Sequence, residues 1–491
     1  MTATDQGPGR SLPPPPAGPL PSGEPVDGPG LPPPPTGPLP PGEPVALPES
    51  VSPANVGDHA RTRMLPYGLA RAFGAAGPYL MQAAMWHWAG AAPAGRFFLL
   101  ASAAMFLVLL ADLGAGNAFP LLWGSRPGRA VPELADVLTM RQGVAVAGVV
   151  ALGGAAAAGL WRQMSLTEAL LIGVFVCSRT ALTARQGRLY AFQRFDLLVR
   201  AAACHAGGLL AGLGVAMGAL GMTPTACLLA LIAGNVAELV AMAAWGAGSL
   251  GDDLPPPRAV SWSERLRLAW RRLAPFAVAG VAAAVYVRSD AFIGDLFLEP
   301  EALGRFGTID ALYRLAIAPV YLSGQAVYPA INAAHEEGRP AALRLGVWHH
   351  LLTGGILAAV GMGVFAALTV GQPATGPGSP FWWPFFLAIP VAVPAALVAP
   401  LCYSRRQERA MATLAVTTGL ARPLGAWLLV ASLGPAGLAV NHLALDAGQT
   451  FIALAVFPWL GAARWAAGPP PSQASQPSPD QAPRSPPPGA S

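Results

Sequence analysis

The sequence predicts an all-α integral membrane protein with about twelve transmembrane helices, arranged as two parallel six-helix halves. Of its 491 residues, 53% are hydrophobic and only 11% are charged, whereas a soluble protein carries roughly 25% charged residues. A large soluble domain could not cover its surface with so few charges. Long apolar runs recur along the chain, and the 30 basic residues, all of them arginine, gather in alternate loops between these runs.

Proline-rich segments flank the apolar region at both ends of the chain. Residues 1–62 and 467–491 cannot bury enough apolar surface to offset chain entropy, so we expect disordered cytoplasmic tails. The N-terminal tail contains LPPPPAGPLPSGEPV and, 19 residues later, LPPPPTGPLPPGEPV. Its PxxP spacing fits an SH3- or WW-like groove, so polysaccharide biosynthesis enzymes are candidate partners. A passive, repeat-expanded tail is the alternative.

Twelve apolar runs are the predicted transmembrane spans, and most are long enough to cross a hydrocarbon core of about 30 Å. No signal peptide is expected, so the first span, near Met64, would direct insertion. Residues 63–250 form the N-terminal half and residues 275–466 the C-terminal half. The spans are 64–86, 97–122, 143–161, 166–184, 197–220, 225–247, 275–297, 303–332, 345–370, 382–403, 410–433 and 437–460.

The distribution of arginine supports this assignment. With the N-terminus placed in the cytoplasm, most arginines fall in inner loops and few in outer ones, as the positive-inside rule requires. One missed or extra helix would scramble the alternation. We therefore expect a multi-pass protein of the plasma membrane with both termini cytoplasmic. The arginines form no basic domain that could follow a phosphate backbone, which argues against nucleic-acid binding.

Residues 251–274 are predicted to be a cytoplasmic linker between the halves. Its segment SWSERLRLAWRRLA, residues 261–274, interleaves tryptophan and leucine with four arginines. This pattern is typical of an amphipathic helix that lies on the inner leaflet and contacts membrane lipids.

A short internal repeat supports two similar halves. The second span begins Gly95-Arg96-Phe97 and the eighth begins Gly304-Arg305-Phe306, at an offset of 209 residues. Both spans end in an aromatic residue followed by proline. Six helices per half return the chain to the same side of the membrane, so the repeats would be parallel, as in some transporters.

The stretch Tyr286–Pro329 carries a family resemblance. It contains Arg288-Ser-Asp290, the turn Glu299–Gly304, Phe306, Ala311–Leu315 and Tyr328-Pro329. These residues, and Ala111–Gly114 in the second span, resemble the polysaccharide repeat-unit (O-antigen) flippases of the multidrug/oligosaccharidyl-lipid/polysaccharide exporter superfamily. That resemblance implies a central cleft lined by the first, second, seventh and eighth spans. It also implies translocation of a polyprenyl-pyrophosphate-linked oligosaccharide.

Charged residues at bilayer depth are the candidate site, because an unpaired charge there is costly. Arg71, Arg288, Arg314 and Arg422 are expected to bind the pyrophosphate or an acidic sugar, since guanidinium offers bidentate donors to phosphate. Asp290 is the first candidate for ion or proton coupling. Alternatively, Arg288, Asp290, Asp310 and Arg314 form an ion-pair network, because Asp310 and Arg314 lie four residues apart on one helical face.

Other polar residues within spans are weaker candidates for coupling. The four cysteines lie in or beside apolar runs without CxxC spacing, so no metal or redox site and no cofactor is expected. The weaker coupling candidates are Asp112, Glu238, Asp446, His205 and His442.

The charge pattern and short outer loops favour a carrier over a membrane-bound enzyme. The longest outer loop, GQPATGPGSPF, carries no charge, and no nucleotide-binding or hydrolase motif stands in a credible context. No catalytic residue is predicted. A multidrug or cation antiporter or a lipid II flippase of the same superfamily is the alternative, and so is an interaction protein that acts through its tails.

Overall fold

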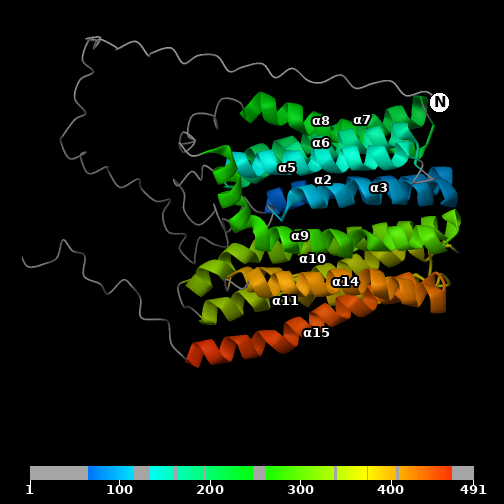
Figure 1. Cartoon of the computed structure of the whole chain (residues 1–491). Helices are drawn as coiled ribbons and strands as arrows, with labels where there is room; N and C mark the ends of the chain where they lie inside the picture. The colour runs from blue at the N-terminus through cyan, green and yellow to red at the C-terminus, as the bar shows by residue number, and fades with distance from the viewer. Residues whose placement is uncertain are drawn as a thin grey trace, which may run out of the picture. The chain divides into compact units, whose positions relative to one another are not determined.

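The computed structural model describes the chain at residues 65–114, 133–158, 164–191, 195–219, 221–246, 261–336, 340–372, 374–404 and 408–466. All regular structure in these ranges is helical (Figure 1). The predicted tails, 1–62 and 467–491, lie outside the described residues, and so does the predicted end of the second span. All described helices belong to one compact unit.

The helices form two groups in chain order, each around its own apolar cluster. The N-terminal half packs around residues such as Phe97 and Leu228, and the C-terminal half around residues such as Phe306 and Phe385. The first group contains α2 (Leu65–Ala89), α3 (Ala91–Asp112), α5 (Glu133–Ala157), α6 (Leu166–Ala191), α7 (Phe195–Ala219) and α8 (Pro224–Gly246). The second contains α9 (Trp262–Phe297), α10 (Pro300–Glu336), α11 (Pro340–Thr369), α12 (Trp382–Ala395), α13 (Val398–Ser404), α14 (Glu408–Leu433) and α15 (Ala436–Ala466).

The predicted all-α membrane fold is confirmed. Within the described ranges, nine segments are long and apolar enough to cross a membrane. Each of the twelve predicted spans coincides with a helix, except that the tenth is divided into α12 and α13. Pro390 and Pro394 lie inside α12. Because proline donates no backbone hydrogen bond, the helix is interrupted just after the second of them.

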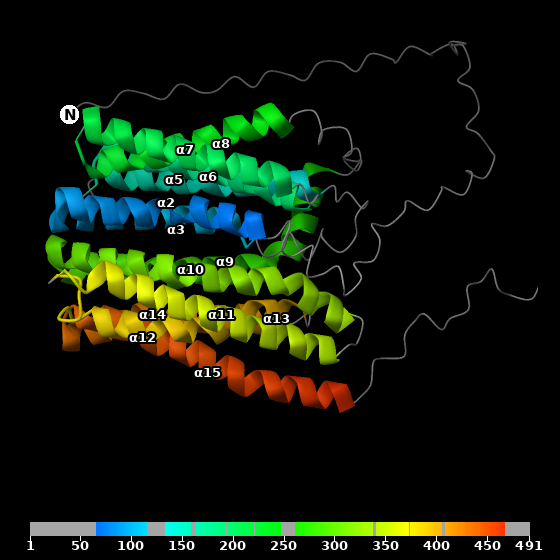
Figure 2. The same cartoon turned by 180° about the vertical axis from the view of Figure 1, so that it is seen from behind.

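The segment predicted as a separate amphipathic helix forms the first turns of α9. Ser261 caps this helix, and its side chain accepts a hydrogen bond from the Glu264 N–H. Arg267 and Arg271 are exposed along these turns. Pro275 lies inside the helix, and Figures 1 and 2 show the first turns running at an angle to the remainder of α9. Residues 262–274 are therefore continuous with the first span of the C-terminal half.

The two halves meet through a reciprocal contact that indicates a two-fold relation. A Cβ atom on Gly95 of α3 would overlap the carbonyl oxygen of Pro300, and one on Gly304 of α10 would overlap that of Ala91. Each of the residue pairs 91/300 and 95/304 is separated by the repeat offset of 209. Such exchange of partners is the signature of a two-fold axis, which here passes between α3 and α10. We call this the Gly95 end.

The halves also touch at the opposite end of α3, through Gly114, which lies just after the last residue of that helix. Gly114 has a φ of +66°, a conformation that only glycine adopts readily, and a Cβ there would overlap the carbonyl of Phe276 in α9. Gly280 of α9 lies against the backbone of Gly114. We call this the Gly114 end. Helices of the two halves therefore approach to backbone contact at both ends in this conformation.

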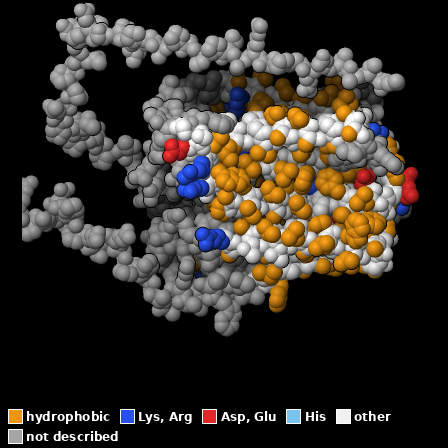
Figure 3. Space-filling view, in the orientation of Figure 1, with side chains coloured by type: hydrophobic (Ala, Val, Ile, Leu, Met, Phe, Trp, Pro, Cys, Tyr) orange, Lys and Arg blue, Asp and Glu red, His pale blue; other side chains and the backbone are white. Residues whose placement is uncertain are grey.

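The surface of the helices suits a lipid environment. Figure 3 shows one face covered largely by apolar side chains, with arginine grouped toward one end. Among the exposed apolar side chains are Val146 of α5, Val278 of α9 and Leu424 of α14. Because a lipid-facing surface needs no charge, this distribution explains the low charged fraction of the sequence.

The Gly95 end predicts a steric test of the contact between the halves. In Gly304→Ala the added Cβ overlaps the Ala91 carbonyl, so we expect a loss of about 1–3 kcal/mol in stability and a lower Tm in detergent. Gly355→Ala in α11 is the matched control, because a Cβ there meets nothing within 4 Å. Equal Tm values for the two variants would contradict the contact.

Candidate functional site

The side chains of α9 divide between two faces of the helix near its middle. Tyr286 and Asp290 are four residues apart and therefore share a face, whereas Arg288 is rotated by about 200° from each of them. Tyr286 and Asp290 contact α14 and α15, and Arg288 contacts α2 of the N-terminal half. This one turn of helix thus reaches both the interior of the C-terminal half and the interface between the halves.

Among the charged residues that meet the Tyr286–Asp290 face of α9, Arg422 of α14 is the most deeply buried, at 0% exposed. Its Nε donates to Asp290 Oδ2 at 2.9 Å, and its Nη2 contacts the same oxygen. The guanidinium lies over the Tyr286 ring, 4.5 Å from the centroid. Asn441 of α15 donates to the Arg422 carbonyl at 3.0 Å. These contacts join α9, α14 and α15 around one cation.

Asp446 of α15 accepts hydrogen bonds from tyrosine hydroxyls on two other helices. Tyr286 of α9 donates to Oδ1, and Tyr313 of α10 donates to Oδ2 at 2.9 Å. His442 lies one turn earlier, with its Nε2 3.2 Å from Asp446 Oδ2. The other ring nitrogen, Nδ1, contacts Arg422 Nη2. His442 therefore links the Asp446 group to the Arg422 group.

The Asp310–Arg314 pair on α10 completes this group of charges. Arg314 Nε donates to Asp310 Oδ2 at 2.7 Å, which confirms the pair expected from the i,i+4 spacing. Arg314 also donates to the Val287 carbonyl of α9 at 3.2 Å. The predicted network of two arginines and two aspartates is only partly right, because Asp290 pairs with Arg422 rather than with a residue of α9 or α10.

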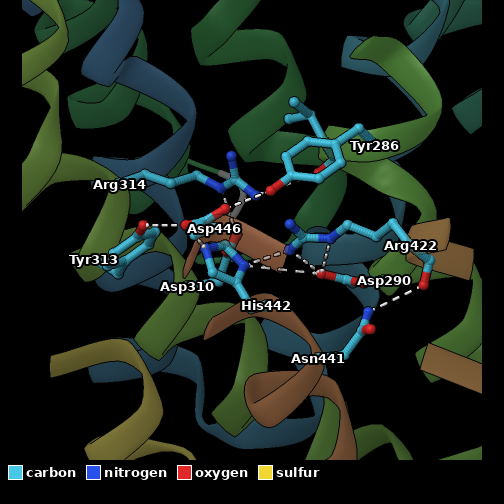
Figure 4. A network of polar contacts seen from close by, with 10 residues as sticks. Tyr286, Asp290, Asp310, Tyr313, Arg314, Arg422, Asn441, His442 and Asp446 are labelled. Atoms are coloured by element: carbon cyan, nitrogen blue, oxygen red, sulfur yellow. Dashed lines mark hydrogen bonds and ion pairs between the residues drawn. The ribbon is translucent and has the colours of Figure 1, made fainter. Parts of the chain in front are cut away.

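These residues form one buried charged cluster, which Figure 4 shows. Its acidic side chains are each 7% exposed or less. Asp290 and Asp310 each keep one buried carboxylate oxygen without a hydrogen-bond partner, so the cluster retains acceptor capacity. We use the name charged cluster for Asp290, Asp310, Arg314, Arg422, His442 and Asp446, together with Tyr286 and Tyr313.

Arg288 has a different environment, at the interface between the halves. It is 5% exposed, and its Nη2 donates to the Tyr79 hydroxyl of α2 at 3.3 Å. Its guanidinium carbon lies 6.0 Å from the centroid of the Tyr79 ring. Within the part of the chain that the structure describes, it has no ion pair, and its Nε has no hydrogen-bond partner. Arg288 is thus a buried cation held by a neutral residue.

Three charges of the cluster have no charged counterpart at the equivalent described positions of the N-terminal half. Tyr79 and Arg288 are separated by 209 residues, so they occupy equivalent positions and face each other across the two-fold axis. At the same offset, Asp290 corresponds to Met81, Asp310 to Ala101 and Arg314 to Met105. Met81 and Ala101 are buried in the apolar cluster of the N-terminal half. The charges therefore belong to one side of a structurally symmetric interface.

The four arginines predicted as one binding site are not gathered as free cations in this conformation. Arg314 and Arg422 are neutralised by aspartate, and Arg288 faces the other half. Arg71 lies in α2, but its side chain is outside the described residues. Four further residues of this region were not singled out from the sequence: Tyr79, Tyr286, Tyr313 and Asn441. His442 and Asp446 were given only as weaker coupling candidates. The i,i+4 spacings Tyr286/Asp290 and His442/Asp446 were the available signals.

Polar pairs in the N-terminal half join neighbouring helices. His205 Nδ1 lies 3.1 Å from Glu238 Oε2, and Gln186 donates to the same carboxylate at 2.6 Å. Near the Gly114 end, Arg141 donates to Asp112 at 2.6 Å. The described cysteines are free thiols. In the described ranges, no group of three or more histidine, cysteine, aspartate or glutamate residues could hold a metal ion.

The buried Arg422–Asp290 pair predicts strong mutual dependence. Asp290→Asn leaves the guanidinium without its carboxylate, so we expect a loss of about 3–5 kcal/mol in unfolding free energy in mixed micelles. The double variant Asp290→Asn/Arg422→Gln should lose less than the sum of the single variants. Glu301→Gln, at an exposed site in the first turn of α10, is the control and should change stability little. Additive losses would mean that the two side chains do not act as a pair.

Solved transporter structures share this fold. No family model and no curated protein matches the chain. An outward-facing multidrug resistance MATE family transporter of the MOP superfamily aligns with a TM-score of 0.60 and 14% identity, covering 84% of this chain and 98% of that one. An inward-facing one aligns with a TM-score of 0.56 and 13% identity, covering 83% and 96%. A MOP superfamily transporter from Pyrococcus furiosus, described by the reverse polarity of its binding pocket, aligns with a TM-score of 0.58 and 13% identity, covering 82% and 95%. The chain therefore has the MATE transporter fold.

Proposed function

We propose that this chain is a membrane transporter that moves a polyprenyl-pyrophosphate-linked oligosaccharide across the plasma membrane by alternating access, for cell-surface polysaccharide synthesis. The fold supports the transport part of the proposal, because similar structures have been solved in inward-facing and outward-facing conformations. Two parallel halves that meet along a two-fold axis can rock about that contact. The proposed substrate follows from the charge at the interface.

Arg288 is the observation that carries the substrate assignment. A buried guanidinium without an ion pair among the described residues is available to an anion. Guanidinium stays protonated and presents a planar fork of donors that fits phosphate oxygens. A pyrophosphate that binds Arg288 would supply the negative charge that Tyr79 does not. The lipid chain would remain in the bilayer while the headgroup passes between the halves.

The bond between Tyr79 and Arg288 would open during transport. Because it joins α2 to α9 across the interface, separating the halves exposes both side chains. In the empty transporter, the Tyr79 hydroxyl would therefore occupy the position beside Arg288 that the substrate anion takes when it binds. Arg314 and Arg422 are neutralised in this conformation and would contribute only after their aspartates rearrange. Arg71 of α2 remains a further candidate on the opposite half.

A multidrug or cation antiporter is the second candidate, and specific observations favour it too. Two of the aligned structures are multidrug resistance transporters. The charged cluster contains three aspartates, of which Asp290 and Asp310 have an oxygen without a partner and could attract a cation. A cationic drug, however, would meet Arg288 first at the interface. The sign of the accessible charge therefore separates the two candidates.

Translocation of a fluorescent lipid-linked glycan in proteoliposomes tests the proposal. Arg288→Ala removes the cation, so we expect the initial rate to fall on the order of a hundredfold, in line with about 2–3 kcal/mol for hydrogen bonds to a charged group. Arg288→Lys keeps the charge but loses the fork, so it should recover part of the rate. Arg305→Ala, exposed at the start of α10, is the matched control and should transport like the wild type.

The competing function is tested in the same vesicles with a cationic dye. Wild-type protein that moves the dye but not the glycan would identify an antiporter instead. Wild-type glycan transport that is unchanged in Arg288→Ala would remove Arg288 from the substrate site.

We propose that the proline-rich tails recruit partner proteins and take no part in transport itself. We expect deletion of residues 1–60 to leave the rate in proteoliposomes unchanged, because the purified system contains no biosynthetic enzymes. The same deletion should lower surface polysaccharide in cells if the PxxP repeats recruit enzymes. A loss of transport in proteoliposomes would show that the N-terminal tail takes part in the transport cycle itself.

A further inference from the structure

His442 lies at the centre of the charged cluster, and imidazole is the side chain whose charge ordinarily changes between about pH 5 and 8. The ring is 3% exposed. It packs edge-on against Tyr313 of α10, with centroids 4.8 Å apart, and lies 4.9 Å from the ring of Phe385 of α12. The titratable and charged groups around it are Asp290 and Tyr286 of α9, Tyr313 and Asp310 of α10, Arg422 of α14 and Asp446 of α15.

The partners of its two ring nitrogens identify the proton that His442 carries. Arg422 can only donate hydrogen bonds, so the contact between Arg422 Nη2 and His442 Nδ1 requires Nδ1 to be an unprotonated acceptor. The ring proton must then be on Nε2, which lies 3.2 Å from Asp446 Oδ2. The contact with Arg422 therefore fits a neutral imidazole, whose Nε2 lies close to Asp446 without forming a hydrogen bond.

A second proton on this ring would break the contact with Arg422. Protonated Nδ1 becomes a donor, and two donors repel one another at hydrogen-bond distance. The imidazolium would instead be attracted to carboxylates on both sides. Asp290 Oδ2 lies 4.0 Å from Nδ1, and Asp290 Oδ1 has no hydrogen-bond partner. The cluster thus contains an acceptor for the incoming proton and a cation that must move away from it.

The same proton changes the charge of the cluster. Arg314 and Arg422 are opposed by Asp290, Asp310 and Asp446. With Arg288 on the other face of α9, three arginines balance three aspartates while His442 is neutral. Protonated His442 makes the total positive. A positive cluster attracts an anion more strongly, and it competes with Arg422 for Asp290.

Competition between His442 and Arg422 for Asp290 can affect the interface between the halves because of where Asp290 lies on α9. Asp290 and Arg288 are two residues apart on one rigid turn of α9. A shift of Asp290 toward His442 rotates or displaces this turn and so changes the contact between Arg288 and Tyr79. The Arg422 carbonyl is held by Asn441, the residue before His442, so α14 and α15 would move together.

We propose that His442 is the proton-binding site that drives the conformational cycle of this transporter. A proton taken up at Nδ1 displaces the Arg422 guanidinium and leaves the imidazolium between Asp290 and Asp446. Its release restores the conformation described above. The coupling part of this inference rests on the proposed transport function, but the proton-dependent rearrangement can be measured without any substrate.

The rearrangement is tested by distances between spin labels on the two halves. Leu166→Cys in α6 and Leu433→Cys in α14 place labels at exposed sites, in a protein whose four native cysteines are replaced by alanine. Between about pH 8 and pH 5.5 we expect the wild-type distance distribution to move from one population to another. His442→Asn should retain the high-pH distribution at both values, because it cannot accept the proton.

A second variant fixes the opposite state. His442→Arg carries a positive charge that does not titrate in this range, so it should retain the low-pH distribution at both values; this keeps the test decisive if His442→Asn fails to fold. His87→Asn, an exposed histidine of α2, is the control and should shift like the wild type. A wild-type distribution that ignores pH, or a full shift in His442→Asn, overturns the proposal.

Transport measurements then separate this inference from the proposed function. An imposed pH gradient should change the wild-type rate of glycan translocation by about tenfold or more, and His442→Asn should translocate equally with and without the gradient. Glycan transport that ignores the gradient overturns proton coupling by His442 but leaves the flippase proposal standing. A pH-dependent distance shift without glycan transport supports the proton site and refutes the proposed substrate.

Discussion

A guanidinium that cannot reach water needs a partner inside the protein, and this requirement organises the C-terminal half. Removing a carboxylate from a buried pair costs several kcal/mol, because the remaining charge is left uncompensated in a medium of low dielectric constant. Arg422 meets the requirement by joining α9 through Asp290 and α15 through His442 and Asn441. Three helices are thereby fixed around charges that, if unpaired, would exclude them from a membrane.

The symmetric packing of the halves makes their chemical asymmetry informative. Reciprocal contacts at Gly95 and Gly304 show that α3 and α10 are related by a two-fold axis. An axis of this kind would allow both halves to carry the same site, yet the residues equivalent to Asp290, Asp310 and Arg314 are methionine and alanine. The N-terminal half therefore offers an apolar surface, together with the hydroxyl of Tyr79, to the charged half.

Local spacing allowed the helices and one ion pair to be predicted from the sequence, whereas the partners across helices could not be. Hydropathy and arginine placement located the twelve spans, and the i,i+4 rule located Asp310 and Arg314. Asp290 and Arg422 are separated by 132 residues, and their pairing depends on how α9 and α14 pack. No sequence period encodes that choice. Pro390 and Pro394 lie in the tenth span, but only tertiary contacts determine whether such a helix bends or breaks.

Because Arg288 and Asp290 lie on one turn of α9, anion binding at Arg288 can be coupled to proton binding at His442. Both residues lie on one turn of α9, one facing the other half and one facing the interior. An α-helix transmits displacement of one face to the other because its backbone hydrogen bonds make each turn nearly rigid. Binding of an anion at Arg288 and binding of a proton at His442 would then favour the same displacement. By linkage, each ligand would then strengthen the binding of the other, which couples anion binding at Arg288 to proton binding at His442.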